Sequence, residues 1–392
     1  MTEHLPRADW TQRASLAKLV EALGAEDLRW VGGCVRDTLL GYPANDIDAA
    51  TRHLPATVID RCRSAGIRTV PTGIDHGTVT AILEDGPVEI TTLRRDVATD
   101  GRRATIAFSE DWRDDAARRD FTINALYAHP ETLAIDDYFG GLDDLSAHRV
   151  RFIGDAATRI REDHLRILRY FRFATRFGDD WDAQASRACS ELAPTLKGLS
   201  RERVGWELQN LLALPDPAAT VDRMHELGVL QEVLPESGRR EVAQLARLVD
   251  AERSAAIAPA AMRRMAALLP AIVPVAETVA ARLRLSRSQR ARLTCIARRE
   301  PQDAAHPQGL AYMVGRECAV DRLLIGGADP APIIDWEAPA FPLKGGEIVA
   351  RGVAKGPEVA RMLQCIEKRW VAERFPSRER VEQLLDEELA AR

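Results

Sequence analysis

The 392-residue sequence has no excess of positive charge, because 54 basic residues stand against 59 acidic ones and give a formal net charge of −5. Any binding of nucleic acid would therefore have to rest on local clusters of basic residues. Aromatic residues are scarce, at 5%. The 46% of hydrophobic and 29% of charged residues are ordinary for a globular protein and exclude an intrinsically disordered chain.

The sequence also lacks any close pair of cysteines and any long hydrophobic run. Its six cysteines lie far apart without a CxxC pair, which argues against a structural zinc site and predicts free thiols in a reducing compartment. The most apolar stretch, residues 266–276, is interrupted by two prolines, whereas a membrane-spanning helix needs about 20 apolar residues. The N-terminal residues show no signal-peptide pattern. We therefore expect a cytoplasmic protein that does not contact a membrane.

The pattern of hydrophobic residues changes along the chain. Residues 1–150 predict a mixture of strands and helices, with strands at 28–31, 78–83 and 87–93 and a helix at 57–65. The remainder of the chain has helical periodicity with few strand signals. At about 100–200 residues per domain, this length suggests two or three domains.

A glycine turn follows the first predicted strand, in the sequence VGGCVRDTLLG (31–41). Two glycines after a strand let backbone amides approach an anion closely, and the helix that follows points its positive end toward that anion. Arg36 lies in the first part of this helix, where it suits a phosphate. The spacing is neither GxGxxG nor a Walker loop, so it supports no dinucleotide fold.

Two carboxylates follow directly, in NDIDAAT (45–51). Asp46 and Asp48 are two residues apart on a predicted strand, so both side chains face the same side. Mg²⁺ prefers carboxylates together with substrate phosphates. Either piece alone is more simply an ordinary glycine turn or a solvated strand end, but the two together favour a site for metal and phosphate. Glu89 is a weak candidate for a third carboxylate.

The segment RRDFTINAL (118–126) offers further phosphate ligands. Arg118 and Arg119 carry forked donors suited to triphosphate oxygens. Asp120 is suited to orienting one of these arginines or to accepting from a ribose hydroxyl. The alternation of apolar residues over 121–127 predicts a half-buried strand. Taken alone, the Arg-Arg-Asp sequence is equally typical of a surface turn.

The segment REDHLRILRYFRFATRFG (161–178) predicts one amphipathic helix. Asp163, Arg166, Arg169 and Arg172 recur every three residues along it, and neighbours at this spacing lie close together. Each step of three residues turns the row by about −60°, so we expect Asp163 and Arg166 to act together and Arg172 to point away. A solvated basic face is the alternative.

In this order, the motifs resemble those of the bacterial tRNA nucleotidyltransferase (CCA-adding enzyme) and poly(A) polymerase family, the class II branch of the polymerase-β-like nucleotidyltransferases. The resemblance extends through YFGGLDDL (138–145) and LSRERVGWELQNLL (199–212). It implies an α+β fold, in which a palm-like head at 1–150 precedes an all-α neck, body and tail. The neck at 151–235 would recognise the nucleotide, and the body and tail at 236–392 would bind tRNA.

The resemblance also implies particular ligands. It places Mg²⁺ on Asp46 and Asp48. The nucleotide contacts that it implies come from Gly33, Arg36 and Arg119 in the head and from Asp163, Arg166 and Arg169 in the neck. The stretch 96–110 resembles the loop that repositions the primer between C and A addition.

The implied activity is the template-independent addition of C, C and A to the 3′ end of tRNA from CTP and ATP, with release of pyrophosphate. Cytosine and adenine both present an exocyclic amine beside an acceptor nitrogen, which Asp163 and Arg166 can address together. A poly(A) polymerase, a CC-only or A-only enzyme, and a non-catalytic RNA-binding protein are the alternatives. A small-molecule nucleotidyltransferase would not need the neck motif or so large a helical region.

Basic residues cluster at 282–299, where seven arginines lie in one predicted helical region. These side chains are suited to neutralising phosphates in the acceptor arm of tRNA, and a solvated face is the alternative for any single one of them. No obligate protein partner is implied. The segment FPLKGGEIVARGVAKGPEVARMLQ (341–364) resembles the C-terminal region of CCA-adding enzymes, which favours that branch of the family.

Overall fold

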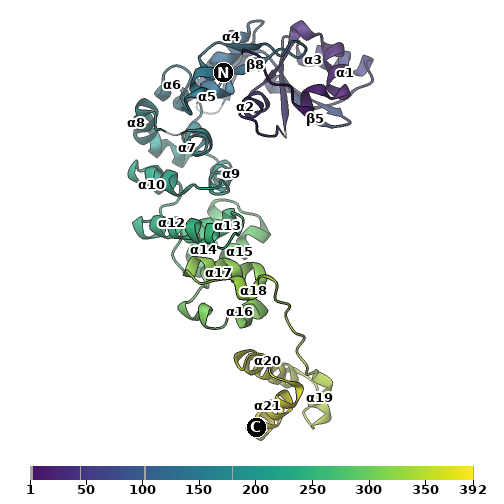
Figure 1. Ribbon diagram of the computed structural model, residues 1–392, viewed down its shortest axis with the longest axis vertical. Helices are drawn as coiled ribbons and strands as arrows, with labels where there is room; N and C mark the ends of the chain where they lie inside the picture. Colours follow the sequence, from purple (N-terminus) through teal and green to yellow (C-terminus); the bar gives the residue numbers. More distant parts are fainter. Residues whose placement is uncertain (1–2, 45, 101–102, 179, 392) are drawn as a thin grey trace. The chain divides into compact units, whose positions relative to one another are not determined.

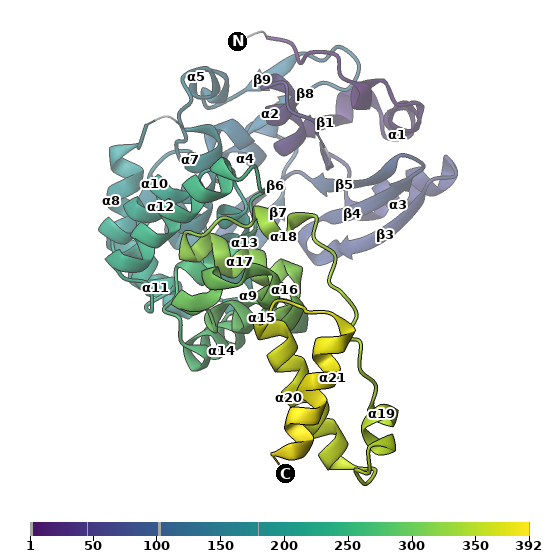
Figure 2. The same cartoon turned by 60° about the horizontal axis from the view of Figure 1, so that its bottom comes forward.

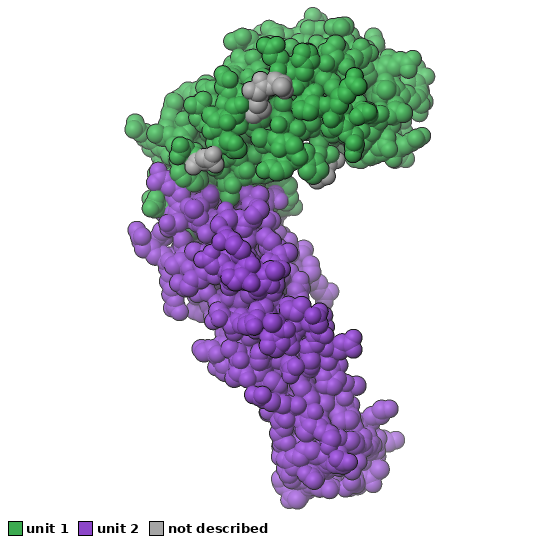
Figure 3. Space-filling view, viewed as in Figure 1, with its two compact units in different colours: residues 1–207, 226–233 green, residues 208–225, 234–392 purple. Residues whose placement is uncertain are grey.

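The computed structural model describes residues 3–44, 46–100, 103–178 and 180–391, and for residues 96–100 and 103–106 it describes the backbone. The chain forms two compact units, which Figure 3 colours separately. Unit 1 comprises residues 1–207 and 226–233, and unit 2 comprises residues 208–225 and 234–392. Within the described residues, no helix is long and apolar enough to cross a membrane. The finer division into head, neck and body with tail stays a prediction.

Unit 1 contains a seven-stranded sheet in the order β3-β4-β5-β2-β1-β8-β9, of which Figure 1 labels β5 and β8. Its strands are β1 (Leu28–Val31), β2 (Ile47–Thr51), β3 (Arg68–Gly73), β4 (Thr78–Leu83), β5 (Gly86–Thr92), β8 (Leu126–Ala128) and β9 (Ile135–Asp137). The pairing of β2 with β5 is parallel and sets Asp48 opposite Glu89, whereas the other pairs are antiparallel. A separate two-stranded sheet consists of β6 (Arg94–Asp100) and β7 (Arg103–Phe108). These two strands occupy most of the stretch expected to form the primer-positioning loop, of which residues 101–102 lie outside the described residues.

The helices of unit 1 are α1 (Ala14–Leu23), α2 (Gly33–Leu39), α3 (Pro55–Ser64), α4 (Trp112–Ala117), α5 (Gly141–Ser146), α6 (Ala156–Glu162), α7 (Arg166–Phe177), α8 (Ala183–Leu192), α9 (Arg201–Leu212), whose last residues belong to unit 2, and α11 (Val229–Val233). Helix α2 packs against β1, β2 and β8, so the glycine turn before it lies at the sheet. Helix α3 begins with Pro55, a residue preorganised for a first helical position. It packs against α1 and against β3 and β4, beside which Figure 2 shows it.

Helix α7 is held in unit 1 by an aromatic cluster. The rings of Phe121 and Phe152 have centroids 4.8 Å apart, and Phe152 stacks on Tyr170 of α7 at 5.6 Å. All three side chains are fully buried. Aromatic pairs of this kind contribute about 0.5–1.5 kcal/mol beyond the area that they bury. The apolar face of α7 is therefore fixed, and its arginines are left to face a neighbouring cavity.

Two expectations about this region are wrong. Residues 161–178 do not form one helix, because α6 ends at Glu162 and α7 begins at Arg166, with Asp163 extended between them (φ −148°). The Asp163 carboxylate accepts the backbone N–H of Leu165 at 3.1 Å, a local bond that competes with helix continuation. Asp163 and Arg166 are therefore not neighbours on a single helix face.

The expected strand over 121–127 is also wrong in its first half. Thr122–Asn124 form a 3₁₀ turn, and the strand begins at Leu126. The Thr122 hydroxyl donates to Asp144 at 2.6 Å, and the Asn124 amide donates to Asp120 at 3.0 Å. These bonds to buried carboxylates outweigh the local preference for a strand.

The helices of unit 2 are α10 (Ala218–Glu226), α12 (Arg239–Ser254), α13 (Ala261–Ala267), α14 (Val273–Arg282), α15 (Arg287–Ala297), α16 (Pro307–Val314), α17 (Arg316–Gly326), α18 (Ala331–Ile334), α19 (Gly345–Ala350), α20 (Pro357–Ala372) and α21 (Arg378–Ala390). A buried ionic network joins three of them. Arg263 donates to Asp321 and to Glu252, each at 2.7 Å, and Arg264 donates to Glu252 at 2.8 Å. The buried charges of this network are thus paired, as a dry interior requires.

The expectation of free thiols is wrong for one pair of cysteines. Cys295 of α15 and Cys318 of α17 form a disulfide whose Cα atoms are 6.4 Å apart. Their separation of 23 residues gives no sign of this contact in the sequence, because the packing of α15 against α17 creates it. The remaining cysteines are free: Cys34, Cys62, Cys189 and Cys365.

The arginines of residues 282–299 do not all face solvent. Arg282 pairs with Glu236 at 2.6 Å, and Arg292 pairs with Asp321 at 2.7 Å, so both side chains already have carboxylate partners. Arg287, Arg290 and Arg298 are exposed and line a shallow hollow on α15. The expected contacts with RNA phosphates stay a prediction for the arginines of this region that have no carboxylate partner among the described residues.

Candidate active site

One cavity in unit 1 is lined by all the residues predicted to have a catalytic, metal-binding or nucleotide-binding role, except the weak candidate Glu89. Its volume is about 620 Å³. The predicted residues on its wall are Gly33, Arg36, Asp46, Asp48, Arg119, Asp163, Arg166 and Arg169. Its wall also includes Gly32, Arg118, Asp120, Asn124, Leu165, Arg172, Phe173, Arg203 and Trp206. Residues from the sheet, from α2 and from the helices after residue 160 thus surround one space.

The glycine turn borders this cavity at the start of α2. Gly32 has φ 75°, a conformation that side-chain-bearing residues rarely adopt, so its glycine is required by the backbone. A Cβ built on Gly33 would lie 3.7 Å from an Arg36 nitrogen, which is an ordinary contact. Gly33 is therefore not demanded by the turn itself, and its missing side chain leaves room toward the cavity.

Arg36 reaches the cavity from within α2 and is almost completely buried. Its Nε donates to Asp37 at 2.8 Å, and Nη1 donates to Asn124. The guanidinium lies 4.4 Å from the ring centre of Phe177. Burial lowers the pKa of Arg36, while Asp37 opposes that shift. The side chain is rigidly held, so its position toward a ligand is fixed before binding.

The predicted carboxylate pair lies at the start of β2. Asp46 is exposed in the bend before the strand, and Asp48 is half-buried within it. Burial raises the pKa of Asp48 to about 6, with Glu89 and Asp46 adding to the shift and Arg119 opposing it. Among the described residues, no group of three or more His, Cys, Asp or Glu side chains is placed to hold a metal ion, so Glu89 does not complete such a cluster.

Arg119 is held by a buried pair that the sequence did not reveal. Its Nε donates to the Tyr127 hydroxyl at 2.9 Å, and its Nη2 donates to Asp115 at 3.1 Å. Tyr127 in turn donates to Asp115 at 2.7 Å. Burial alone would raise the pKa of Asp115, but Arg119 and Arg118 outweigh it and hold that pKa at about 2. The Asp115 carboxylate is therefore ionised and fixes Arg119 at the cavity wall.

Asp120 links the sheet region to α7. Its carboxylate accepts from Asn124 at 3.0 Å and from the Nε of Arg169 at 2.7 Å. Burial would raise the pKa of Asp120, yet Arg169 and the Asn124 hydrogen bond bring it to about 2. The expectation that Asp120 orients Arg118 or Arg119 is wrong, because both of these arginines pair with Asp115. Asp120 instead holds Arg169 of α7.

The two predicted base-contacting residues have separate partners. Asp163 accepts from Arg203 of α9 at 2.7 Å. Arg166 donates to the carbonyl oxygens of Arg159 at 2.9 Å and Arg118 at 2.8 Å, and also pairs with Glu162. Both side chains still border the cavity. Each is therefore oriented by neighbours rather than by the other.

Helix α9 supplies residues that the sequence analysis did not single out. Arg172 of α7, expected to point away, lines the cavity and pairs with Glu207 of α9 at 2.7 Å. Trp206 also lines the cavity and is 58% exposed, unusual for so large an apolar side chain. Trp206 and Glu207 of α9 lie within the motif LSRERVGWELQNLL, but nothing in the spacing of that motif indicates which of its side chains face the cavity.

A carboxylate pair at a strand, a glycine turn and several arginines around one cavity are features of a nucleotidyltransferase. Consistent with that class, residues 28–151 match the family described as Poly A polymerase head domain. Residues 182–238 match the family described as probable RNA and SrmB-binding site of polymerase A.

Whole-chain comparisons are more specific. The chain is 34% identical over 378 residues to the mouse (Mus musculus) CCA tRNA nucleotidyltransferase 1, mitochondrial, covering 91% of this chain and 86% of that protein. It is 42% identical over 202 residues to the CCA-adding enzyme of Streptococcus pyogenes, covering 51% of this chain and 48% of that enzyme. The chain belongs to the CCA-adding tRNA nucleotidyltransferase family.

The fold is similar to that of solved family structures. The crystal structure of the Bacillus stearothermophilus CCA-adding enzyme in complex with CTP superposes with a TM-score of 0.77 at 24% sequence identity. The match covers 97% of this chain and 99% of that one. The predicted α+β architecture is thereby confirmed, and the 34% identity to the mouse relative over 91% of this chain confirms the predicted family.

Proposed function

We propose that this enzyme adds C, C and A to the 3′ end of tRNA, using CTP and ATP and releasing pyrophosphate. The observation that carries the proposal is the single cavity on which all the predicted catalytic and nucleotide-binding residues meet. The relatives named for CCA addition support the substrate. In the reaction, the 3′-hydroxyl of the RNA attacks the α-phosphate in line, and the bond to pyrophosphate breaks.

Nucleotidyltransferases of this kind generally need a divalent metal ion, and we assign Mg²⁺ to Asp46 and Asp48. Within the described residues neither carboxylate has an ion-pair partner. Burial raises the pKa of Asp48 to about 6, and the negative charges of Glu89 and Asp46 add to that shift. A bound cation would relieve that repulsion, so the donor set fits Mg²⁺. When bound, the metal would stabilise the charge on the attacking and leaving oxygens.

The triphosphate is assigned to the glycine turn and to the arginines beside it. Arg119 is held toward the cavity by Tyr127 and Asp115, so it presents its free N–H groups without having to reorganise. Arg36 is similarly fixed by Asp37. Preorganised donors of this type stabilise developing negative charge more than mobile ones do.

Base selection is assigned to Asp163, Arg166 and Arg169. A carboxylate at Asp163 accepts from the exocyclic amine of cytosine or adenine, whereas uracil and guanine would direct a carbonyl lone pair at it. Arg203 keeps the carboxylate in place. Trp206 lies one helical turn after Arg203 on α9, and its exposed indole supplies a stacking face for the incoming base.

The division of the chain into a catalytic head (1–150), a nucleotide-recognising neck (151–235) and a tRNA-binding body with tail (236–392) belongs to the same proposal. The match of residues 28–151 to the head-domain family supports the first boundary. We assign the enzyme to the cytoplasm on the basis of its sequence, although the vertebrate relatives include mitochondrial enzymes.

The test is incorporation of α-labelled CTP into a tRNA that ends at its discriminator base. Asp48→Asn should abolish incorporation at saturating Mg²⁺ while the melting temperature stays near that of the parent. Asp60→Asn is the matched control, because Asp60 lies on α3 with its side chain 70% exposed and pairs with Arg63 alone among the described residues. Normal turnover in Asp48→Asn would refute the assignment of the active site.

A further inference from the structure

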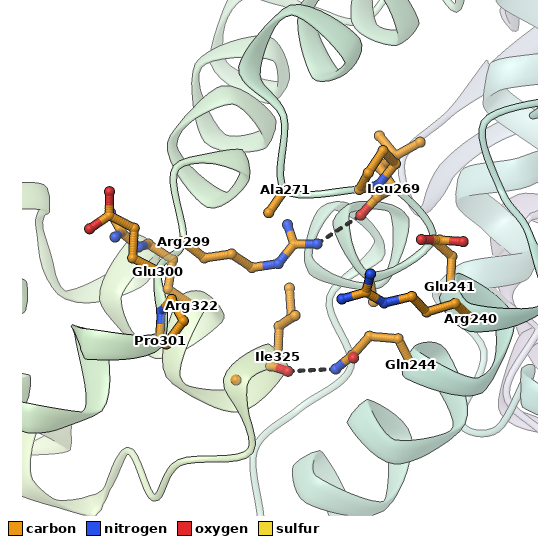
Figure 4. A pocket seen from close by; sticks show the side chains of 13 residues that line it. Arg240, Glu241, Gln244, Leu269, Ala271, Arg299, Glu300, Pro301, Arg322 and Ile325 are labelled. Atoms are coloured by element: carbon orange, nitrogen blue, oxygen red, sulfur yellow. Dashed lines mark hydrogen bonds between the residues drawn. The ribbon is translucent and has the colours of Figure 1, made fainter.

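Unit 2 contains a cavity that no sequence motif indicates, and one of the residues on its wall, Arg299, belongs to the arginine cluster at 282–299. Its volume is about 390 Å³, and it lies among α12, the ends of α13 and α15, and α17 (Figure 4). One part of its wall is apolar and is formed by Leu269, Pro270 and Ile325. The other part carries arginines. A concave site that combines apolar walls with a few charged groups is the usual form of a binding site.

Arg299, two residues after the end of α15, forms no ion pair with a carboxylate of the described residues. Its half-buried guanidinium donates only to carbonyl oxygens, to that of Leu269 at 2.7 Å and to that of Ile296 at 3.4 Å. Burial lowers the pKa of Arg299, the nearby charge of Arg240 lowers it further, and Glu241 opposes the shift. By contrast, Arg322 on the same wall is neutralised by Asp303, with its Nε 2.8 Å from the carboxylate. Burying a guanidinium without a paired anion destabilises the folded protein, so the position of Arg299 indicates a role in binding an anion.

Arg240 of α12 faces the same space. Figure 4 shows its guanidinium and that of Arg299 reaching into the cavity from opposite sides. The neighbouring carboxylates are engaged elsewhere, because Glu241 accepts the backbone N–H of Gly238 at 3.0 Å and Glu300 bonds Gln302. In Figure 4, Glu300 points away from the two guanidiniums. Two like charges therefore face one space, and neither guanidinium forms an ion pair with a described carboxylate, although Glu241 on the same wall interacts electrostatically with Arg299.

We propose that this cavity binds a phosphate group between Arg240 and Arg299. Guanidinium forks match phosphate oxygens in pairs and form charge-assisted hydrogen bonds with them. The apolar wall suits a sugar or base attached to that phosphate. An RNA backbone and a free phosphorylated molecule share this chemistry. The RNA source rests on the proposed function, whereas the free phosphate source does not.

The experiment compares the parent enzyme with Arg240→Gln and Arg299→Gln, and uses Arg239→Gln as the matched control. Arg239 is exposed, adjacent in the sequence and not on the cavity wall, so its replacement changes the charge without changing the site. Two quantities are measured for each protein: the affinity for a tRNA lacking CCA as a function of salt, and the affinity for inorganic phosphate by calorimetry. Arg240 is exposed, so Arg240→Gln remains informative if Arg299→Gln fails to fold.

For an RNA phosphate, both cavity variants should weaken tRNA binding about tenfold relative to Arg239→Gln, and each should reduce the salt slope by about one. For a free phosphate, tRNA affinity should stay unchanged while phosphate binding to the parent is lost in both variants. If Arg240→Gln alters neither affinity relative to the control, the cavity is not a phosphate site. A parent enzyme that binds phosphate here but no tRNA would contradict the proposed function and leave the cavity assignment standing.

Discussion

Removing one hydroxyl, by Tyr127→Phe, tests whether Arg119 acts through its buried support. Tyr127 is 0% exposed, and its hydroxyl accepts from Arg119 at 2.9 Å while donating to Asp115 at 2.7 Å. Burial raises the pKa of Tyr127, so the hydroxyl stays protonated and able to donate. Hydrogen bonds to charged groups contribute about 1.5–3 kcal/mol each. In the variant Asp115 stays paired with Arg118 and Arg119, which limits the expected loss in the free energy of unfolding to about 2–4 kcal/mol.

The same change should lower kcat/KM for both CTP and ATP by about tenfold, or about 1.4 kcal/mol, since Arg119 keeps only one of its two supports. The assays are urea unfolding and initial rates of incorporation. Tyr138→Phe is the control, because its ring lies 6.1 Å from that of Tyr127 and its hydroxyl makes no hydrogen bond with the described residues. A double variant with Arg119→Ala completes the cycle. Fully additive effects on kcat/KM would refute the reasoning, because residues that act as a unit are not additive.

Three further predictions concern the active-site cavity of unit 1 and the carboxylates beside it. Asp163→Ala should shrink the preference for CTP over UTP while some catalysis persists, and a parental ratio of the two kcat/KM values would place base selection elsewhere. Trp206→Ala should raise the KM for CTP about tenfold, because stacking on an aromatic side chain contributes about 1–3 kcal/mol per base. Trp206→Phe should restore most of the affinity for CTP. An unchanged KM in the alanine variant would exclude stacking. The free energy of unfolding should fall as the pH drops from about 5 to 2, because Asp115 and Asp120 have folded-state pKa values of about 2, below their ordinary value near 3.9. In this range the unfolded chain binds more protons than the folded one, so Asp120→Asn should make the free energy of unfolding less dependent on pH. An unchanged pH dependence in that variant would contradict this cause.

Features set by neighbouring residues were predictable from the sequence. The strand at 28–31 occurs with the expected bounds as β1, and so does the strand at 78–83 as β4. The glycine turn after β1 was predictable because a positive φ at Gly32 leaves glycine as the favoured residue. These signals are local, so no knowledge of tertiary packing was needed.

Features set by long-range contacts were not predictable from the residues. Arg203 lies 40 positions from the Asp163 that it holds, and the spacing of Asp163 and Arg166 suggested instead that the two act on one helix. The helix break at Asp163 depends on a side-chain bond to the backbone that periodicity does not register. The disulfide between Cys295 and Cys318 likewise exists because two helices pack together.

The most direct test of the central claim is to offer tRNAs ending at the discriminator base, at C and at CC, with each of the four nucleoside triphosphates separately, and to sequence the 3′ ends. The account predicts that CTP extends the first two substrates, that ATP extends only the third, by one residue, and that UTP and GTP extend none. Long runs of A from ATP on any of these ends would contradict it, and would identify a poly(A) polymerase built on the same fold.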